Sequence, residues 1–568
     1  MTSSQHRRLW RSALAGSAAF TVIAAVVAAA PDSSAAKSPT PALSLIAASK
    51  NVTLDSWKED PGVWLDLGTY LTAEKAALEL RITRKSYKHP VVIQQIVRDG
   101  KTTTTKTLPA GTVKDFSGLP GFAQITITDK AGKTVAKRTE SFCPNNASGR
   151  VRPDAPAKSK YPESCPTNPF TLGSVWGVEK GWASNTYAGY YGGDQIKIAP
   201  GKYTAKVSVT KKYRDLFGIP NKPQTINLTV RERSWEEMGM GRAAASGHGD
   251  HSAGHAHHGA PQAPRTLGEA TSGTGPAYNV GHGPHPPAPP ALPWALKANA
   301  RTLANVGDGP GRTDGSRKAP GAKPNAKRPT GKASVPNVPK PDLRSLPAYG
   351  IMISESDENE PGKDYLSFSA NVWNAGPAKL VVDGFRTPGK ELMDAYQYFY
   401  DANGKQVGYT PTGTMEWDPR PGHEHWHFTD FASYRLLKAD QKEAVRSGKE
   451  AFCLANTDAV DYTVKNANWH PSNTDLSTAC GQESSISVRE VLDVGSGDTY
   501  TQDLPGQSFD ITDVPNGTYY IQVLANPEKR LKETSLTNNS ALRKIVLGGK
   551  PGKRTVTVPP HELVDANL

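Results

Sequence analysis

The stretch Gly422-His423-Glu424-His425-Trp426-His427-Phe428 predicts a β-strand that carries a metal site. Successive side chains of a strand point to opposite faces, so His423, His425 and His427 would project from one side, close enough together to bind a single ion. Imidazole nitrogen suits copper, zinc, nickel and iron, so the ligand type alone leaves the metal open. The alternative is a histidine-rich face of an exposed strand, which the strict period of two disfavours.

The sequence around this stretch predicts a β-rich domain over residues 341–549, followed by a tail over 550–568. Runs rich in aromatic and β-branched residues indicate its strands. They cover 365–374, 396–400, 425–434, 485–488, 519–523 and 542–547. Turn residues at 401–404 and 515–517 fit hairpins. One helix is expected from Ala439 to Gly448, because Gly448 stands where helices commonly end.

The N-terminal part of the chain, residues 41–232, also alternates in the manner of strands. Glycine and proline clusters separate the runs, as in an antiparallel sandwich. The clearest runs cover 77–82, 123–127, 195–198, 203–209 and 225–230. The expected fold class is therefore all-β, with one or two N-terminal β-sandwich-like domains, a long linker and the β-rich C-terminal domain.

The linker, residues 233–340, is dominated by Gly, Pro, Ala, Lys and Arg, which predicts a disordered or semi-extended segment. Its histidines are His248, His251, His255, His257, His258, His282 and His285. They suggest either a flexible metal-capturing segment or a solvated linker. The second interpretation is favoured, because a disordered ligand set loses conformational entropy for each ion that it holds.

The N-terminus predicts export. Basic residues precede an apolar run from Ala13 to Ala30 and then small residues, which indicates a signal peptide over residues 1–36. An uncleaved membrane anchor is the alternative. No second span follows, so we expect a secreted, extracellular or surface-associated protein. In an oxidising compartment the four cysteines are expected to pair locally, Cys143 with Cys165 and Cys453 with Cys480, the simplest of three connectivities.

The net charge of +13 suggests a polyanionic partner surface, such as a cell wall. Part of the positive charge clusters in the linker, which we expect to dock on that surface. The cluster comprises Arg317, Lys318, Lys323, Lys327, Arg328 and Lys332. Nucleic acid is a poorer candidate for this partner, since the sequence has no recognisable nucleic-acid-binding motif.

Three further segments, taken with the histidine strand, carry a resemblance to a known family. They are Gly448-Lys449-Glu450-Ala451-Phe452-Cys453-Leu454, the stretch 497–503 and the stretch 509–520. In their order, spacing and local sequence they resemble the catalytic domain of the lysyl oxidases. The resemblance covers roughly Asp342 to Val546. The residues that match the family's copper strand are His423, His425, His427, Asp430, Phe431 and Tyr434. The family's cofactor lysine and tyrosine fall on Lys449 and Tyr500.

The resemblance implies a secreted, bacterial-type homologue with a self-made quinone, lysine tyrosylquinone, which forms from Lys449 and Tyr500 in the presence of Cu²⁺ and O2. Tyrosine offers the oxidisable phenol and lysine the nucleophilic amine. The implied activity converts primary amines, lysine side chains above all, to aldehydes with O2 and releases H2O2 and ammonia. The cofactor carries the hard step. Asp458, Asp461 and His470 are candidates for the catalytic base, and geometry must decide among them.

The resemblance also suggests a calcium site, with Asp342, Glu533, Asn538 and Asn539 as ligands. Ser535 stands where the family has an acid, which would weaken calcium binding. The alternative is that the two asparagines form a turn before the last strand. The chain has fewer cysteines than animal members of the family, and residues 418–422 separate Trp417 from the histidines differently.

Two rival functions belong to other classes. One is a copper-binding cell-surface or matrix protein that makes no quinone and has no oxidase activity. The other is a zinc hydrolase, since three histidines and a water form a catalytic zinc layout. The zinc hydrolase interpretation does not explain why Lys449 and Tyr500 fall at the positions of the family's cofactor lysine and tyrosine.

Overall fold

The computed structural model describes the chain from residue 41 to residue 566 with internal gaps. The described ranges are 41–99, 101–146, 148–187, 195–234, 329, 331–354, 362–386, 392–418, 425–447, 451–471, 480–502 and 507–566. The chain divides into the units 1–38 and 39–568, so only the second has described residues. The predicted signal peptide, the linker histidines and most of the linker's basic cluster lie outside these ranges. Within them, no helix is long and apolar enough to cross a membrane.

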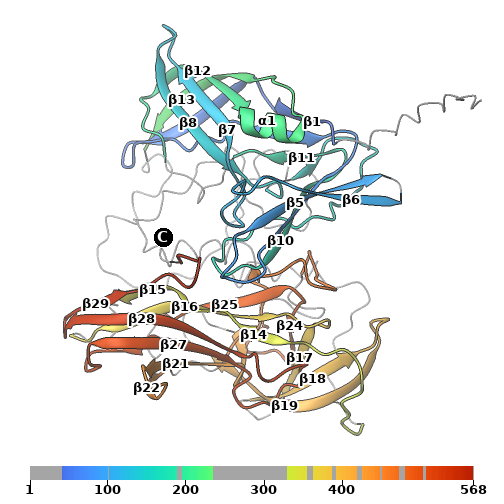
Figure 1. Ribbon diagram of the computed structural model, residues 1–568, viewed down its shortest axis with the longest axis vertical. Helices are drawn as coiled ribbons and strands as arrows, with labels where there is room; N and C mark the ends of the chain where they lie inside the picture. Colours follow the sequence, from blue (N-terminus) through green and yellow to red (C-terminus); the bar gives the residue numbers. More distant parts are fainter. Residues whose placement is uncertain are drawn as a thin grey trace, which may run out of the picture. The chain divides into compact units, whose positions relative to one another are not determined.

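Three sheets form the N-terminal β-body, drawn in blue to green in Figure 1. The first contains β1 (Leu43–Ala47), β3 (Thr69–Ala73), β11 (Trp182–Asn185) and β9 (Gly149–Arg150). The second contains β10 (Gly173–Val178), β4 (Leu78–Thr83), β5 (Val92–Asp99) and β6 (Thr102–Thr107). The third contains β2 (Asn51–Trp57), β13 (Gln224–Arg233), β12 (Gly201–Val209), β7 (Leu119–Thr128) and β8 (Thr134–Phe142).

One hydrophobic core joins these three sheets. Leu71 of β3, Leu80 of β4 and Ile226 of β13 are all buried members of it. Apolar side chains alternate with polar ones along β12 and β13, as expected for strands with one buried face. The N-terminal strands therefore do not form two separately packed sandwiches.

Two details of the N-terminal β-body differ from the sequence predictions. The run 195–198 is not a strand, since only Ile196 pairs, in an isolated bridge with Val63. A helix that was not predicted, α1 (Lys211–Phe217), ends at Gly218, whose φ of 65° suits glycine. Seven residues are too few to show a helical hydrophobic period clearly.

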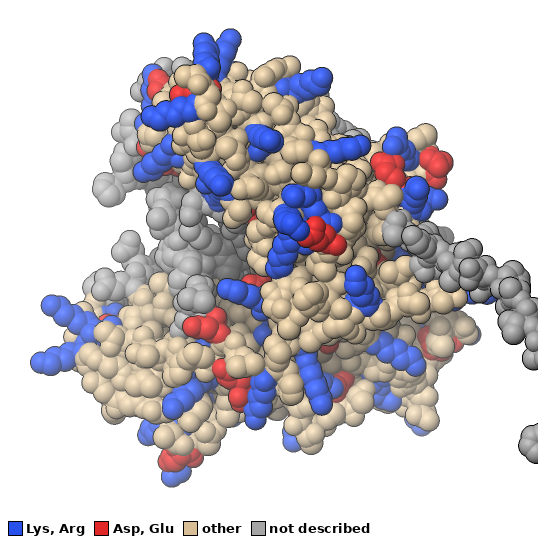
Figure 2. Space-filling view, turned by 45° about the horizontal axis from the view of Figure 1, so that its top comes forward, with Lys and Arg blue, Asp and Glu red and all other residues tan. Residues whose placement is uncertain are grey.

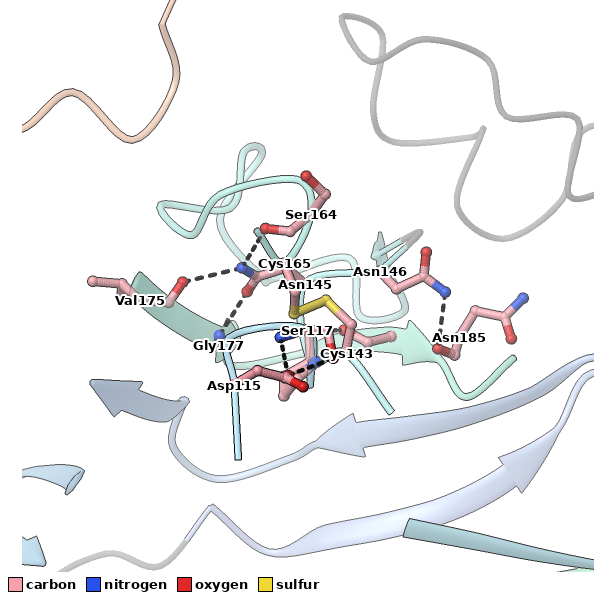
Figure 3. Close-up of a disulfide and its surroundings, with 12 residues drawn as sticks. Asp115, Ser117, Cys143, Asn145, Asn146, Ser164, Cys165, Val175, Gly177 and Asn185 are labelled. Atoms are coloured by element: carbon pink, nitrogen blue, oxygen red, sulfur yellow. Dashed lines mark hydrogen bonds between the residues drawn. A yellow bond between two sulfur atoms is a disulfide. The ribbon is translucent and has the colours of Figure 1, made fainter. Parts of the chain in front are cut away.

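The predicted Cys143–Cys165 disulfide is confirmed. Figure 3 shows it beside Asn145, whose amide links three parts of the chain. Asn145 Nδ2 donates to the carbonyls of Ser164 (3.1 Å) and Val175 (3.0 Å), and its Oδ1 accepts from the Gly177 N–H at 2.8 Å. The disulfide and this buried amide together fix the segment between β8 and β10, which has few strand pairings of its own.

Three further sheets form the C-terminal β-body, drawn in yellow to red in Figure 1. The first contains β14 (Leu343–Ser345), β16 (Tyr365–Asn374), β25 (Ser496–Gln502) and β23 (Asp458–Ala459), with β15 (Tyr349–Ser354) and β26 (Phe509–Asp510) also on β16. The second contains β20 (His425–Phe428), β19 (Gln406–Asp418), β18 (Met393–Tyr400), β17 (Leu380–Arg386) and β24 (Ser487–Leu492). The third contains β22 (Glu443–Arg446), β21 (Ala432–Lys438), β27 (Gly517–Ala525), β28 (Ser540–Lys550) and β29 (Lys553–Thr557). A shared core includes Phe368, Met415 and Ile521, one from each sheet.

The helix predicted from Ala439 to Gly448 is wrong. Its described part forms a hairpin, in which β22 pairs with β21 and Arg446 lies opposite Arg435. The turn is stabilised by the Asp440 carboxylate, which accepts a hydrogen bond from the Lys442 N–H at 3.1 Å, and it places Gln441 at a φ of 65°. The unpaired edge of β21 offers a strand partner, and this tertiary contact overrides the local helix signal.

The single strand predicted over 425–434 is in fact two strands in different sheets. The chain breaks at 429–431, where Asp430 adopts a φ of 60°. β20 pairs with β19, whereas β21 pairs with β27. The histidine strand therefore sits where the chain passes from one sheet to the next.

Candidate metal and cofactor site

Both edges of β20 are held by backbone hydrogen bonds. On one edge it pairs with β19, where Trp417 lies opposite Trp426. On the other edge, Phe428 exchanges two hydrogen bonds with Phe452 (2.7 and 2.9 Å), and the Trp426 N–H donates to the Cys480 carbonyl at 3.1 Å. β20 is the last strand of its sheet, but because both of its edges are bonded it has little freedom to shift its register.

His425 and His427 project from the same face of β20, as predicted. Their ring centroids lie 4.6 Å apart, and His427 is only 1 % exposed. A buried carboxylate, Asp418 of β19, has its Oδ2 3.5 Å from His427 Nδ1. A carboxylate on one ring nitrogen orients a histidine so that the other nitrogen can bind a metal.

His423 lies outside the described residues, as does Lys449. Within the described ranges, no group of three His, Cys, Asp or Glu side chains is placed to hold an ion. Two of the three predicted ligands therefore have a defined position, and the copper site itself stays a prediction.

The Cys453–Cys480 disulfide, also confirmed, ties together the two segments that border β20. Cys453 directly follows Phe452, and Cys480 provides the carbonyl that binds Trp426. Both cysteines are buried in the core of the C-terminal β-body. The crosslink therefore holds the segment that begins just after Lys449 against the histidine strand.

Tyr500 of β25 lies against this same segment. Its hydroxyl donates a hydrogen bond to the Cys453 carbonyl, and its ring meets the Phe452 ring edge-on with the centroids 4.8 Å apart. The Tyr500 side chain is half-buried. Lys449 is three residues before Phe452, and three residues span at most about 11 Å. The chain length thus allows the lysine side chain to reach the tyrosine ring.

Two buried carboxylates that the sequence interpretation missed fix the segment after Phe452. Asp498, 2 % exposed, accepts a hydrogen bond from the Ala455 N–H at 3.3 Å. Glu490 of β24, 0 % exposed, accepts one from the Leu454 N–H at 2.9 Å. Asp498 comes two residues before Tyr500 and so shares its face of the strand. That period of two was a usable sequence signal, whereas nothing local marked Glu490.

A second tyrosine packs against the same phenylalanine as Tyr500. Tyr434 of β21 packs edge-on against Phe452, with 5.9 Å between the centroids. Burial, and then the charge of Asp498, raises the pKa of Tyr434 well above its ordinary value. Tyr434 therefore stays protonated, which suits a side chain that packs inside the core.

The three candidate bases are not placed beside Tyr500 by their contacts. The Asp458 carboxylate accepts a hydrogen bond from the Thr499 hydroxyl, and Thr499 points to the face of β25 opposite Tyr500. The Asp461 carboxylate binds the N–H and hydroxyl of Thr463 within its own turn. His470 is exposed. Burial raises the pKa of Asp458, but this carboxyl group lies on the face of β25 opposite Tyr500.

Comparison with known proteins bears on this arrangement. The model of the lysyl oxidase family matches residues 397–556, which include β20, the Phe452 segment and Tyr500. The chain carries a lysyl oxidase domain. Lysyl oxidase homolog 3B of Danio rerio is 32 % identical over 132 residues, 22 % of this chain and 14 % of that protein. Protein-lysine 6-oxidase of Homo sapiens is 34 % identical over 125 residues, 22 % of this chain and 26 % of that protein.

Each relative matches only part of the chain. Lysyl oxidase homolog 2 of Gallus gallus is 30 % identical over 166 residues, 28 % of this chain and 19 % of that protein. The matched region thus spans about a quarter or less of each of these relatives. All three are vertebrate proteins, and none supports the bacterial-type part of the prediction. A solved tetra-tandem repeat of a large adhesion protein matches with 8 % identity and a TM-score of 0.09, covering 88 % of this chain and 98 % of that one, which carries no argument.

Gln502 is a further buried polar side chain of the lysyl oxidase domain on the Tyr500 face of β25. It is 0 % exposed, and neither its Nε2 nor its Oε1 has a hydrogen-bond partner among the described residues. Its neighbour across the sheet is Phe368, which packs against Tyr434. A buried amide without a partner is costly, so this side chain is expected to lower the stability of the domain.

We expect Gln502→Met to raise the free energy of unfolding of the copper-free protein by about 1–3 kcal/mol, since it removes an unpaired buried amide at similar volume. The check is urea-induced unfolding. Gln397→Met is the matched control, because the Gln397 amide is also 0 % exposed but bonds the Lys532 carbonyl (2.9 Å) and N–H (2.7 Å). The control should lose stability. A loss of stability in both variants would contradict the assignment.

The four predicted calcium ligands come together at the start of β14 and the end of the β27–β28 connection. Asn538 Nδ2 donates to both carboxylate oxygens of Asp342, each at 3.1 Å. Asn539 Nδ2 donates to Glu533 Oε1 at 2.8 Å, and Asn526, which was not predicted, donates to the same oxygen at 2.6 Å. These four side chains lie close together, but their proximity does not by itself make a calcium site.

Three observations bear on calcium binding, one in favour and two against. The Oδ1 atoms of Asn538 and Asn539 are buried without partners among the described residues, as ligand oxygens would be without their ion. Arg344, however, already holds Asp342 Oδ2, with Nε at 2.9 Å and Nη2 at 2.8 Å. Ser535, in the place of an acid, turns to the Thr537 hydroxyl at 3.1 Å. Calcium binding here therefore stays a prediction.

We expect calcium to raise the thermal midpoint more at about pH 7.5 than at about pH 4.5. Burial, together with the charge of Asp342, raises the pKa of Glu533 despite hydrogen bonds from Asn526 and Asn539. Without an ion, the stability from this group is present at low pH and lost as pH rises through the folded pKa. Calcium favours the carboxylate and so restores stability at the higher pH.

The matched variants for this test are Ser535→Asp and Thr534→Asp. The first adds a carboxylate where the family has one, whereas the second adds the same charge at an exposed neighbour. Only the first should increase the calcium-induced shift. Equal shifts in both variants, or none in the wild type at millimolar calcium, would count against the site.

Proposed function

We propose that the protein is a secreted copper- and quinone-dependent amine oxidase, which converts primary amines, in particular lysine side chains, to aldehydes with O2 and releases H2O2 and ammonia. The observation that carries this proposal is the hydrogen bond from the Tyr500 hydroxyl to the Cys453 carbonyl. It supports the proposal because it puts the one tyrosine that matches the family's cofactor residue beside the segment that follows Lys449.

The residues present fit the implied groups. His425 and His427, with His423, offer three imidazoles of the kind that suits copper. Tyr500 and Lys449 are the two side chains that would form the lysine tyrosylquinone. When present, this quinone supplies an electrophilic carbonyl that takes two electrons from the amine.

The chain's own residues then perform the positioning. Asp498 and Glu490 hold Leu454 and Ala455 from two different sheets, and the disulfide holds Cys453. The Phe452 ring limits the movement of Tyr500. Because these contacts are formed before any ligand arrives, Tyr500 is preorganised for modification.

The charge of the C-terminal part suits a cationic substrate. Residues 341–568 have 22 Lys and Arg against 31 Asp and Glu, a net charge of −9. A negative surface raises the local concentration of an ammonium-bearing chain and is screened by salt. Lysine side chains on basic proteins, which carry many positive charges, fit this field better than a small monoamine, which carries one.

The test is aerobic turnover by copper-loaded full-length protein with a lysine-containing peptide, free lysine and a simple monoamine. We expect peroxide and aldehyde in equal amounts, with the peptide as the best substrate and with activity falling as salt rises. Stoichiometric copper without amine-dependent O2 uptake would contradict the proposal and favour the alternative, a copper-binding surface or matrix protein.

A further inference from the structure

The two β-bodies carry charges of opposite sign. Residues 41–234 have 29 Lys and Arg against 16 Asp and Glu, a net charge of +13, whereas residues 341–568 have a net charge of −9. In Figure 2, blue side chains outnumber red ones over the upper part, which in Figure 1 contains β7, β8, β12 and β13. The net charge of the N-terminal β-body alone therefore equals the net charge of the whole chain, +13 in both cases.

Three exposed lysines on one face of a sheet contribute to this positive net charge. The outward side chains of β2, β13, β12, β7 and β8 form what we call the lysine face. Lys206 of β12 lies between Thr225 of β13 and Thr126 of β7, and Thr126 lies opposite Lys137 of β8. Lys202 lies four residues before Lys206 on the same strand and so shares its face. All three lysines are exposed.

Among the described residues, no acidic side chain neutralises the three lysines of the lysine face. The one acidic residue of the lysine face, Asp55, is paired with Arg231, whose guanidinium donates two hydrogen bonds of 2.8 and 3.0 Å to the carboxylate. Lys137, Lys202 and Lys206 form no ion pair with any described acid. Their remaining neighbours are mostly threonine and asparagine, which can donate further hydrogen bonds.

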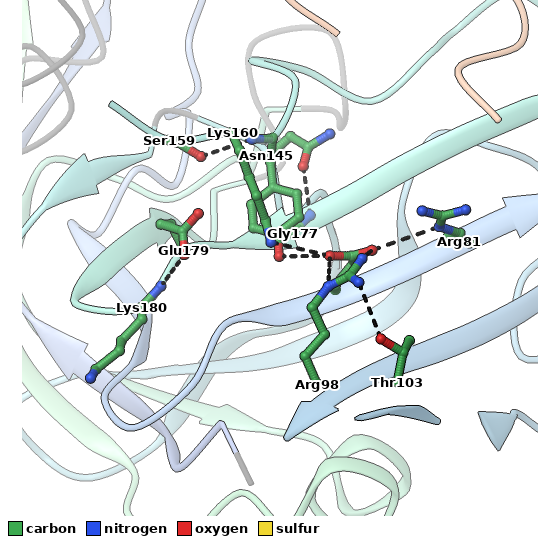
Figure 4. Close-up of polar contacts among 11 residues, drawn as sticks. Arg81, Arg98, Thr103, Asn145, Ser159, Lys160, Gly177, Glu179 and Lys180 are labelled. Atoms are coloured by element: carbon green, nitrogen blue, oxygen red, sulfur yellow. Dashed lines mark hydrogen bonds and ion pairs between the residues drawn. The ribbon is translucent and has the colours of Figure 1, made fainter. Parts of the chain in front are cut away.

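A second cationic cluster on the same β-body shows the contrast. Figure 4 shows Arg81, Arg98 and Lys160 converging on one place. There the buried Glu79 carboxylate lies 2.7 Å from Arg98 Nη2, 3.4 Å from Lys160 Nζ and 3.7 Å from Arg81 Nε. Burial would raise the pKa of Glu79, but the hydrogen bond from Arg98 and the charges of Lys160 and Arg98 lower it. This cluster has an internal counter-ion and needs no ligand.

We propose that the lysine face binds a linear anionic polymer of a cell surface, with phosphodiester or carboxylate groups along its chain. Lys137 and Lys206 lie two strands apart, about 10 Å, and Lys202 and Lys206 about 13 Å apart along the strand. This spacing is too wide for three ammonium groups to meet one small anion. An extended polymer, by contrast, places separate anionic groups opposite each of them.

The same geometry argues against other polymers. The face exposes no aromatic side chain among its described positions, so it lacks a platform for stacking sugars or unpaired bases. It is the face of a five-stranded sheet, formed by strands and not by a helix of the kind that enters the major groove of duplex DNA. The partner is therefore recognised by charge and hydrogen bonding along its backbone.

The test measures binding of the full chain to immobilised poly(glycerol phosphate) and to polygalacturonate over a range of salt concentrations. In Lys137→Gln/Lys202→Gln/Lys206→Gln, affinity at about 0.1 M salt should fall by at least about tenfold, and the slope of log affinity against log salt should become shallower by about 2. The two polymers tell phosphate from carboxylate recognition, and binding to either supports the proposal.

The matched control is Lys544→Gln/Lys550→Gln/Lys553→Gln, which removes the same charge from exposed positions of the C-terminal β-body. It should leave affinity within about twofold of the wild type. Equal losses in both variants would reduce the effect to net charge and overturn the proposal. Binding that is insensitive to salt, or duplex DNA that displaces both polymers at equal anion concentration, would also overturn it. Amine oxidation enters none of these readouts.

Discussion

Tyr500→Phe is expected to lower the rate of amine oxidation by at least about a thousandfold while the protein stays folded and still binds copper. The substitution removes the phenol, which the proposed quinone requires, and keeps the ring that packs against Phe452. Loss of the hydrogen bond to the Cys453 carbonyl should cost only about 0.5–1.5 kcal/mol of the free energy of unfolding.

The control for this prediction is Tyr519→Phe. The Tyr519 hydroxyl also donates to a backbone carbonyl in the lysyl oxidase domain, that of Pro515 at 2.7 Å, but belongs to β27. The two variants should lose similar stability, and only Tyr500→Phe should lose oxidation. Retained oxidation in Tyr500→Phe would remove Tyr500 from the chemistry.

His427→Gln is expected to weaken copper binding by more than about a hundredfold and to abolish oxidation with it. His427 is buried, with Asp418 3.5 Å from its Nδ1, so water cannot readily replace the lost imidazole. Competition with a copper chelator measures the affinity. A melting curve checks that the buried substitution has not unfolded the domain.

The exposed His89, whose ring bonds the Ser86 hydroxyl at 2.8 Å in the N-terminal β-body, provides the control. His89→Gln should leave copper affinity unchanged. If His427→Gln kept full copper affinity while remaining folded, the metal would have to lie elsewhere, and the linker histidines would become the alternative.

The sequence predicted what depends on local pattern. Strict alternation placed His425 and His427 on one face, and short spacing paired the four cysteines correctly. Local pattern failed where tertiary partners decide. Residues 443–446 became a strand because β21 offered an edge, and the position of Asp458, one of three candidate bases, depended on the pairing of β23 with β25, which the sequence does not show.

Buried polar groups mark the other limit of prediction from sequence. Glu490 and Gln502 look like ordinary surface residues in the sequence, and only the packing of three sheets reveals that they are fully buried. The uneven charge of the two β-bodies was visible in the sequence, but the lysine face needed the register of five strands.

The most direct test of the central claim is peptide mass spectrometry of copper-loaded, aerated protein, with and without phenylhydrazine. The proposed function predicts one covalently linked species that contains the Lys449 and Tyr500 peptides and gains mass with phenylhydrazine, and it predicts none in the copper-free protein. Copper bound by the histidine strand with Lys449 and Tyr500 both unmodified would contradict the claim and leave a metal-binding domain.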